Sequence, residues 1–407
     1  MSETVRYTDM KDSGIKWIGE VPASWNVRTL YQLATRVNNK NSDLAEQNLL
    51  SLSYGKIKRK DINTKDGLLP ASFDGYNIIE AGDIVLRLTD LQNDHTSLRV
   101  GQATERGIIT SAYTTLQPIN PSNARYLYYL LHAFDLKKGF YGMGSGVRQG
   151  LNYDEVKELR SVLPSQIEQD AIVSYLDDVC QQIDLIIEEA KSSIEGYKGW
   201  RLSTIKEVTT HGISKDVEMV DTEISWAKSI PSNWNIGKGH YFASTYSGRA
   251  IPGDGTTGSI PVYGSGGSFK KTENPLYAGE AVLFGRKGTL GKPIYVNRPF
   301  WAVDTIYYAV CNEKWMLPKY LYYMLTIFDW ESFITHTALP SIVANEVFSS
   351  VFICPPISEQ LQIIKKLDCV CDNADTAIEA TEHLIEELEL YKRSLIYEAV
   401  TGKRKVV

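Results

Sequence analysis

The chain of 407 residues repeats part of its own sequence, and this repeat limits the folds that are open to it. The segment DSGIKWIGEVPASWNV at 12–27 returns as DTEISWAKSIPSNWNI at 221–236. Three more pairs follow in the same order: AGDIVL and AGEAVL at 81 and 278, RYLYYLLHAFD and KYLYYMLTIFD at 125 and 319, and LPSQIEQDAIVSYLD and CPPISEQLQIIKKLD at 163 and 354. Shared composition does not preserve the order of four blocks, so the sequence predicts two related structural units.

The spacing of the blocks shows where the two copies differ. The offset between matching blocks falls from 209 to 197, then to 194 and 191. The second copy is therefore shorter mainly between its first two blocks, inside the globular part. Loop interiors tolerate changes of length and often carry binding function. Two similar frames with different interiors predict a protein that makes two related but non-identical contacts.

Each copy begins with a mixed, loop-rich part. Strand-like runs lie at 83–88, 108–116, 281–284 and 305–310, separated by Gly, Asn, Asp and Pro. A short aromatic helix is expected at 124–134 and again at 318–328. The tyrosines of these helices could stack on nucleic-acid bases, but their helical spacing favours a face buried in a core.

A long helix is expected to follow each mixed part. After Pro164 the apolar residues from Ile172 to Tyr197 recur in steps of three and four, and after Pro356 a similar stripe runs from Ile357 to Ala399. A helix of about 40 residues spans roughly 60 Å and is unstable alone with a single apolar stripe. The two stripes are therefore expected to pack together, and a pseudo-two-fold relation between the copies makes the pair antiparallel.

These elements predict an α+β chain with two mixed α/β domains, separated by a long antiparallel two-helix coiled-coil spacer. The expected boundaries are 1–164 for the first domain, 165–212 for the first spacer helix, 213–357 for the second domain and 358–407 for the second helix.

Composition and motifs favour a binding protein over an enzyme. The sequence contains no Walker A pattern, no HExxH motif and no methyltransferase-like Asn-Pro-Pro-Tyr sequence, and the five cysteines have no zinc or disulfide spacing. We therefore expect no catalytic residues, no metal site and no cofactor in this chain. The N-terminal residues have no apolar signal region and no stretch is long enough to span a membrane, so a reduced, cytoplasmic protein is expected.

Candidate binding residues lie in Gly-, Ser- and Lys-rich segments. In the first copy they are Lys56, Lys58, Arg59 and Lys60, for which a solvated hairpin face is an equal alternative, and Ser145, Arg148 and Gln149 in GMGSGVRQG. In the second copy, residues 238–298 hold eight basic and three acidic side chains, although exposed turns with incidental charge remain an alternative. The candidates there are Ser247, Arg249, Tyr263, Ser265, Lys270, Lys271, Arg286, Lys287 and Thr289.

Several short motifs together resemble one family. They are the Pro-x-x-x-Glu-Gln pattern at 164–169 and 355–360, EAVTG at 398–402, the weaker EVTTHG at 207–212, and FGRKGTLGKPIYV at 284–296. The combination, which covers essentially the whole chain, resembles the specificity (S) subunit of type I restriction-modification systems.

The resemblance implies a DNA-binding role. Each globular domain would be a target-recognition domain that reads one half of a bipartite sequence in double-stranded DNA. The helices would dock two modification (methyltransferase) subunits, which bind S-adenosylmethionine. Restriction subunits would add ATP-driven translocation and cleavage, with Mg in the partner subunits. The alternatives from the residues alone are a coiled-coil adaptor that binds only proteins, and a fused DNA methyltransferase or nuclease.

The net charge of −6 is compatible with this role once it is divided along the chain. The two expected helical segments, 165–212 and 358–407, hold 11 basic and 19 acidic residues. The two globular parts hold the remaining 32 basic and 30 acidic residues. Because phosphate neutralisation sets non-specific affinity, the isolated chain is expected to bind DNA weakly and to need its partner subunits as a clamp.

Overall fold

The computed structural model describes residues 6–63, 70, 72–143, 150–214, 216–251, 258–335 and 337–406. Contacts within the chain divide it into two compact units. Unit 1 consists of Met1–Glu189 and His383–Val407, and unit 2 consists of Ala190–Glu382. Each unit therefore contains a globular part and portions of two long helices.

Unit 1 is built around a four-stranded antiparallel sheet. Its strand order is β4-β11-β8-β9, with bounds Ala34–Arg36, Thr114–Pro118, Ile84–Leu86 and Val100–Gln102. Helix α1 (Ala124–Leu136) packs on β9 and β11. The remaining helical segments are α2 (Tyr153–Val156) and the 3-10 turns η1 (Leu30–Gln32), η2 (Pro121–Asn123) and η3 (Gly139–Gly142).

Four short strand pairs complete unit 1, and all are antiparallel. They are β1–β2 (Met10–Asp12 with Glu20–Pro22), β3–β12 (Asn26–Thr29 with Arg160–Leu163), β5–β6 (Leu50–Ser53 with Lys56–Arg59) and β7–β10 (Asn77–Ile79 with Gly107–Ile109). The run at 108–116, expected as one strand, is interrupted. Strand β10 ends at Ile109 and β11 begins at Thr114, because residues 110–113 form a turn in which Tyr113 N–H donates to Thr110 O.

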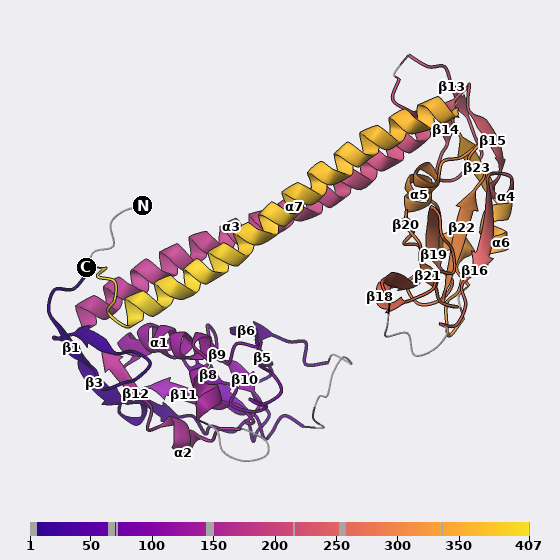
Figure 1. Cartoon of the computed structure of the whole chain (residues 1–407). Helices are drawn as coiled ribbons and strands as arrows, with labels where there is room; N and C mark the ends of the chain where they lie inside the picture. Colours follow the sequence, from indigo (N-terminus) through magenta and orange to yellow (C-terminus); the bar gives the residue numbers. More distant parts are fainter. Residues whose placement is uncertain are drawn as a thin grey trace. The chain divides into compact units, whose positions relative to one another are not determined.

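Unit 2 contains a second four-stranded sheet with the corresponding order β16-β22-β19-β20 (Figure 1). The bounds are Ala243–Ser247, Ile306–Cys311, Ala281–Gly285 and Ile294–Val296. Helix α5 (Pro318–Thr326) packs on β19, β20 and β22. Other short elements are α4 (Gly239–Phe242), α6 (Ala344–Ser349), η4 (Glu331–Phe333) and the pairs β13–β14 (Met219–Asp221 with Ser229–Pro231) and β15–β23 (Asn235–Lys238 with Val351–Cys354).

The interiors of the two units differ, which confirms the expectation of a shared frame with unlike interiors. Unit 1 has the β5–β6 and β7–β10 pairs, whereas unit 2 has a three-stranded sheet of order β18-β17-β21. The bounds of these strands are Gly267–Thr272, Ile260–Gly264 and Trp301–Ala302. In both units these additional strands begin directly after the first strand of the four-stranded sheet, β4 in unit 1 and β16 in unit 2. The offset between the two copies of the sequence changes most in this part of the chain.

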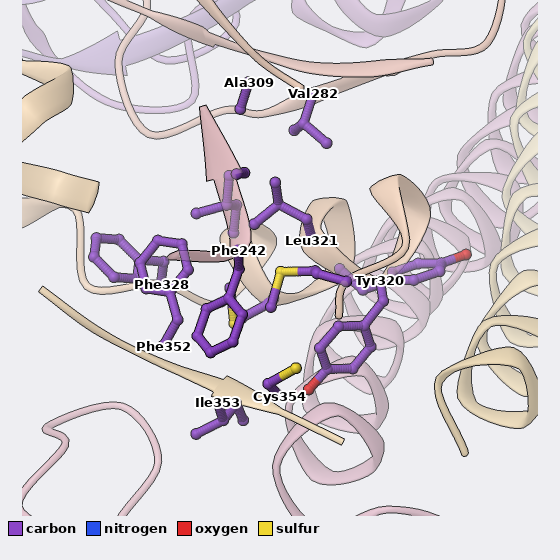
Figure 2. Close-up of a cluster of buried hydrophobic side chains, with 14 of the residues drawn as sticks. Phe242, Val282, Ala309, Tyr320, Leu321, Phe328, Phe352, Ile353 and Cys354 are labelled. Atoms are coloured by element: carbon purple, nitrogen blue, oxygen red, sulfur yellow. The ribbon is translucent and has the colours of Figure 1, made fainter. Parts of the chain in front are cut away.

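The largest apolar cluster of unit 2 lies between α5 and its neighbouring strands. Figure 2 shows its aromatic members Phe242, Phe328 and Phe352 together with Tyr320 and Leu321 of α5. The rings of Phe328 and Phe352 lie 5.8 Å apart, edge to face. In unit 1 the corresponding helix α1 contributes Tyr126, Tyr129 and Leu130 to a buried cluster.

Two long helices are present, as the sequence predicts. Helix α3 runs through Gln166–His211 and α7 through Ile357–Val400. In unit 1 the first part of α3 packs on the last part of α7 through residues that include Ile183, Ile187 and Leu395. The predicted apolar stripes are wrong in part. Tyr197, Leu361 and Tyr391 belong to them but are exposed, whereas Ile363, which lies outside the stripe of α7, is buried in the core of unit 2. Within the described residues, no helix is long and apolar enough to cross a membrane.

Candidate functional site

The Pro-x-x-x-Glu-Gln motifs attach each long helix to its globular part. In unit 1 the indole N–H of Trp25 donates to Glu168 Oε1 at 3.2 Å, and in unit 2 that of Trp234 donates to Glu359 Oε2 at 2.9 Å. Gln169 Nε2 donates to Pro164 O at 3.0 Å, and Gln360 Nε2 donates to Pro355 O at 2.8 Å and also to Trp315 O at 2.7 Å. These repeated residues therefore belong to the structural frame of each unit.

The aromatic helices belong to the core rather than to an exposed stacking surface. Tyr126, Tyr129, Tyr320 and Tyr323 are all at least 96% buried, which confirms the core interpretation for these residues. Tyr126 Oη donates to Val400 O at the end of α7, and Tyr320 Oη donates to Thr209 O near the end of α3. Burial raises the pKa of both phenols well above the ordinary value, so both remain hydroxyl donors.

Most candidate residues of unit 2 lie on one group of connected loops, whereas Tyr263, Lys270 and Lys271 lie on strands β17 and β18. We call this group the loop face. It comprises residues 247–249, 264–267, 286–290 and 303–305 together with Ser341. Strand β18 continues directly from the second of these loops.

Hydrogen bonds join the loops of this face to one another. Thr289 N–H donates to Ser265 Oγ at 3.3 Å, so these two predicted residues lie together. The backbone N–H groups of Arg286 and Lys287 both donate to Thr305 O, at 2.9 and 3.2 Å. The loop face is thus a connected structure and not a set of independent turns.

Two further contacts extend the loop face. Arg249 N–H donates to Ala302 O at 2.8 Å, beside the 303–305 loop. Ile342 N–H donates to Arg286 O at 3.0 Å, and Lys287 pairs with Ser341 in an isolated β-bridge. Ser341 lies in no basic or Gly-rich segment, so nothing in the sequence pointed to this contact.

The cationic side chains of the loop face and of the adjoining strand β18 have no acidic partner in the part of the chain that the structure describes. This holds for Arg249, Lys270, Lys271, Arg286 and Lys287, and all of them except the half-buried Arg286 are exposed. The Arg286 guanidinium lies 5.8 Å from the centre of the Tyr307 ring, a cation–π contact that leaves its charge uncompensated. Such unpaired cations are available to phosphate oxygens.

The predicted basic run of unit 1 is differently placed. Lys56, Lys58 and Arg59 lie on β6, and Lys60 follows it; all four are exposed. Arg59 Nε donates to both carboxylate oxygens of Glu105, at 2.7 and 2.9 Å, and this contact holds the pKa of Glu105 below its ordinary value. Lys56 Nζ lies 4.0 Å from Asp184 Oδ2 on α3. Two of the four cations are therefore already engaged within unit 1.

The other candidates fall into three groups. Ser145, Arg148 and Gln149 lie outside the described residues. Ser247 ends β16 in an exposed position. Tyr263 is 7% exposed and its ring meets Phe300 edge to face at 6.3 Å, so this side chain supports the core beneath the loop face.

One exposed aromatic residue of this region was missed by the sequence analysis. Phe269 on β18 is 56% exposed, although it stands directly before Lys270 and Lys271. Its side chain is apolar, whereas the binding signal in this segment came from charged and hydroxyl side chains. No group of three or more His, Cys, Asp or Glu side chains in the described ranges could hold a metal ion.

Comparisons with known proteins place the loop face inside a recognised domain. Residues 242–390 match the family model of the type I restriction modification DNA specificity domain. The sequence matches no curated protein in the corresponding search.

Solved structures show the same fold over nearly the whole chain. One comes from work titled "Structural basis underlying complex assembly and conformational transition of the type I R-M system", with a TM-score of 0.70 at 12% identity, covering 93% of this chain and 98% of the other. Another is the HsdS subunit from Thermoanaerobacter tengcongensis, with a TM-score of 0.51 at 13% identity, covering 94% of this chain and 98% of the other. Residues 242–390 therefore match the type I restriction modification DNA specificity domain, and nearly the whole chain shares the fold of these solved structures.

Proposed function

We propose that the chain reads a bipartite target in double-stranded DNA, with one half-site recognised by each globular part. The observation that carries this proposal is the position of the loop face inside the DNA specificity domain at 242–390. Its unpaired cations suit phosphate contacts, which fix register. Its hydroxyl and glycine residues suit close approach to base edges.

The long helices act, on this proposal, as an antiparallel coiled-coil spacer between two target-recognition domains. The domains are those expected from the sequence, 1–164 and 213–357, with spacer helices at 165–212 and 358–407. Matched ion pairs support this arrangement: Lys392 Nζ donates to Asp184 Oδ1 at 2.6 Å within unit 1, and Arg201 pairs with Asp375 within unit 2. Asp375 follows Asp184 by 191 residues, and Lys392 follows Arg201 by 191 residues, so the two ion pairs occupy equivalent positions in the repeat.

The chemistry of the complex resides, on this proposal, in partner subunits. The chain positions two modification subunits that bind S-adenosylmethionine, and restriction subunits that use ATP and Mg, and it has no catalytic activity of its own. The predicted contacts of unit 1 (Lys56, Lys58, Arg59, Lys60, Ser145, Arg148 and Gln149) and those of the loop face remain part of the proposal.

A segment exchange tests the assignment of half-sites. Residues 238–298 are replaced by the corresponding segment of another specificity subunit, and the chain is expressed with its modification subunits. Methylation mapping should show that one half-site changes while the other half-site and the gap remain. The matched control exchanges residues 30–118 of the first copy, which should change the other half-site.

Three outcomes would contradict the proposal. A change in both half-sites after the first exchange would show that recognition is not divided between the units. Methyl transfer by the purified chain alone would favour a fused methyltransferase, and assembly with partners but no sequence-specific DNA binding would favour a protein-only adaptor.

A further inference from the structure

Strand β18 contains a β-bulge, and the extra residue is Phe269. In the pairing of β17 with β18, Val262 lies opposite Lys270 and Tyr263 lies opposite Ser268, so Phe269 has no partner in the register. Bulges bend a strand and redirect a side chain, and they occur often beside functional sites. Here the redirected side chain is a phenyl ring that is 56% exposed.

The ring of Phe269 is supported at the turn of this hairpin. A Cβ added to Gly264 would lie 3.4 Å from Phe269 Cε1 and 3.6 Å from Val303 Cγ2. The ring therefore lies beside the Gly264 backbone, close to Val303, whose N–H donates to Tyr263 O at 3.0 Å. One side of the ring is held against the loop face while the rest remains exposed.

The surroundings of Phe269 suit DNA. Lys270 and Lys271 follow it, both exposed and without an acidic partner among the described residues. Strand β18 is an edge strand of the β18-β17-β21 sheet, so one of its backbone edges is unpaired within this sheet. A two-stranded β-ribbon fits the major groove, where lysines beside it can reach phosphates.

A phenyl ring has no hydrogen-bond donor or acceptor with which to read a base edge. The apolar group that the base pairs present in the major groove is the C5 methyl of thymine, and phenylalanine is one of the side chains that contact it. We propose that Phe269 is a specificity-determining residue that contacts a thymine methyl group in the half-site read by unit 2. This inference rests on the proposed function and adds to it a residue and the base group that it reads.

Uracil substitution tests the proposal, because uracil differs from thymine only by the absent methyl group. The full chain is assembled with its modification subunits on its target duplex, and each thymine of the half-site is replaced singly by uracil. For the wild-type complex, one replacement should weaken binding about fourfold, the effect expected for one buried methyl group. For Phe269→Ala the same replacement should have no effect, and Phe269→Leu should retain part of it.

Tyr241→Ala is the matched control, because Tyr241 is an exposed aromatic residue of the same unit, 65% exposed, on α4. This variant should discriminate thymine from uracil as the wild type does. Thermal unfolding of each variant verifies that unit 2 is folded.

The outcomes separate this inference from the proposed function. Specific binding by the wild type with equal affinity for every thymine and uracil duplex would overturn the role of Phe269 and leave DNA recognition standing. Three further results would also overturn the role of Phe269 but not DNA recognition. The half-site has no thymine on either strand, or Phe269→Ala still discriminates thymine from uracil. In the third, the Phe269→Ala chain folds but fails to assemble with its partner subunits. Absence of any sequence-specific binding by the wild-type complex would overturn both.

Discussion

The indole Nε1 of Trp234 donates a hydrogen bond to Glu359 Oε2 across 2.9 Å and joins residues 125 positions apart in the sequence. A Cβ added to Gly212 would lie 2.7 Å from Oε1 of the same carboxylate, so the end of α3 reaches this contact as well. Gly212 has φ of 75°, a left-handed conformation that suits glycine after a helix end. Three segments of unit 2 therefore meet at one carboxylate.

Trp234→Phe should destabilise unit 2, because the variant keeps the aromatic ring but leaves Glu359 without its indole donor. We expect a loss of about 1–2 kcal/mol in the free energy of unfolding, as for a hydrogen bond to a charged group that is partly exposed. Denaturant unfolding followed by circular dichroism measures it. The control is Trp315→Phe at a side chain that is 52% exposed, for which the change should stay within about 0.5 kcal/mol. Equal losses in both variants would refute a specific role for the Trp234–Glu359 bond.

Replacing Lys270 and Lys271 with glutamine should lower the salt dependence of DNA binding. Each lysine that contacts a phosphate contributes about one to the slope of log affinity against log salt, so the slope of the assembled complex should fall by about two. Lys157→Gln is the matched control, because Lys157 is paired with Asp154 at 2.7 Å and is not among the proposed DNA contacts. Titrations between about 50 and 200 mM salt measure both slopes. If Lys157→Gln lowered the slope as much as the changes at Lys270 and Lys271 do, the distinction between paired and unpaired cations would be wrong.

Shortening both long helices should change the gap between half-sites. The ion pairs Asp184–Lys392 and Arg201–Asp375 bracket residues 185–200 of α3 and 376–391 of α7, and one heptad is deleted within each bracket. The deletion removes about 10 Å of helix, which corresponds to roughly 3 base pairs of DNA. Methylation mapping measures the gap, and replacing the same heptads at constant length is the control. An unchanged gap after the deletion would show that the helices do not measure it.

The buried carboxyl group of Asp135 should make unit 1 less stable as the pH rises. Burial raises the pKa of Asp135 from 3.8 to about 6, and only Oδ2 has a described partner, the N–H of Arg99 at 2.5 Å. Between about pH 4 and pH 6 the folded state holds a proton that the unfolded state has released. The stabilising contribution is thus complete below pH 4 and is lost as the pH rises through 6.

Asp135→Asn keeps an oxygen acceptor for Arg99 and carries no charge to bury. Relative to the wild type, its free energy of unfolding should rise by up to about 3 kcal/mol between pH 4 and pH 8. Asp83, whose pKa is also raised by burial to about 6, remains in both proteins, so the difference isolates Asp135. Parallel pH profiles of the two proteins would contradict the assignment.

The repeated blocks and the apolar periodicity correctly predicted two related units and two long helices. Both signals come from contacts that each copy of the repeat must make in order to fold. Trp25 and Trp234 make the same bond to Glu168 and Glu359, and both long helices form. The individual residues that are buried along the long helices were less predictable. Leu361 is 56% exposed and Ile363 fully buried, since the first turns of α7 also pack on the globular part of unit 2 and its apolar face follows that contact.

The order and periodicity of residues were enough to predict two related units, two long helices and a basic, Gly-rich segment in the second half of the chain. Tertiary structure alone decided which cations are free: Arg59 meets Glu105 from 46 residues away, whereas Lys270 and Lys271 meet no described carboxylate. It also decided that Tyr263 is buried and that the bulge turns Phe269 outward. Ion pairing, burial and strand register depend on residues distant in the chain, and the composition of a loop does not specify them.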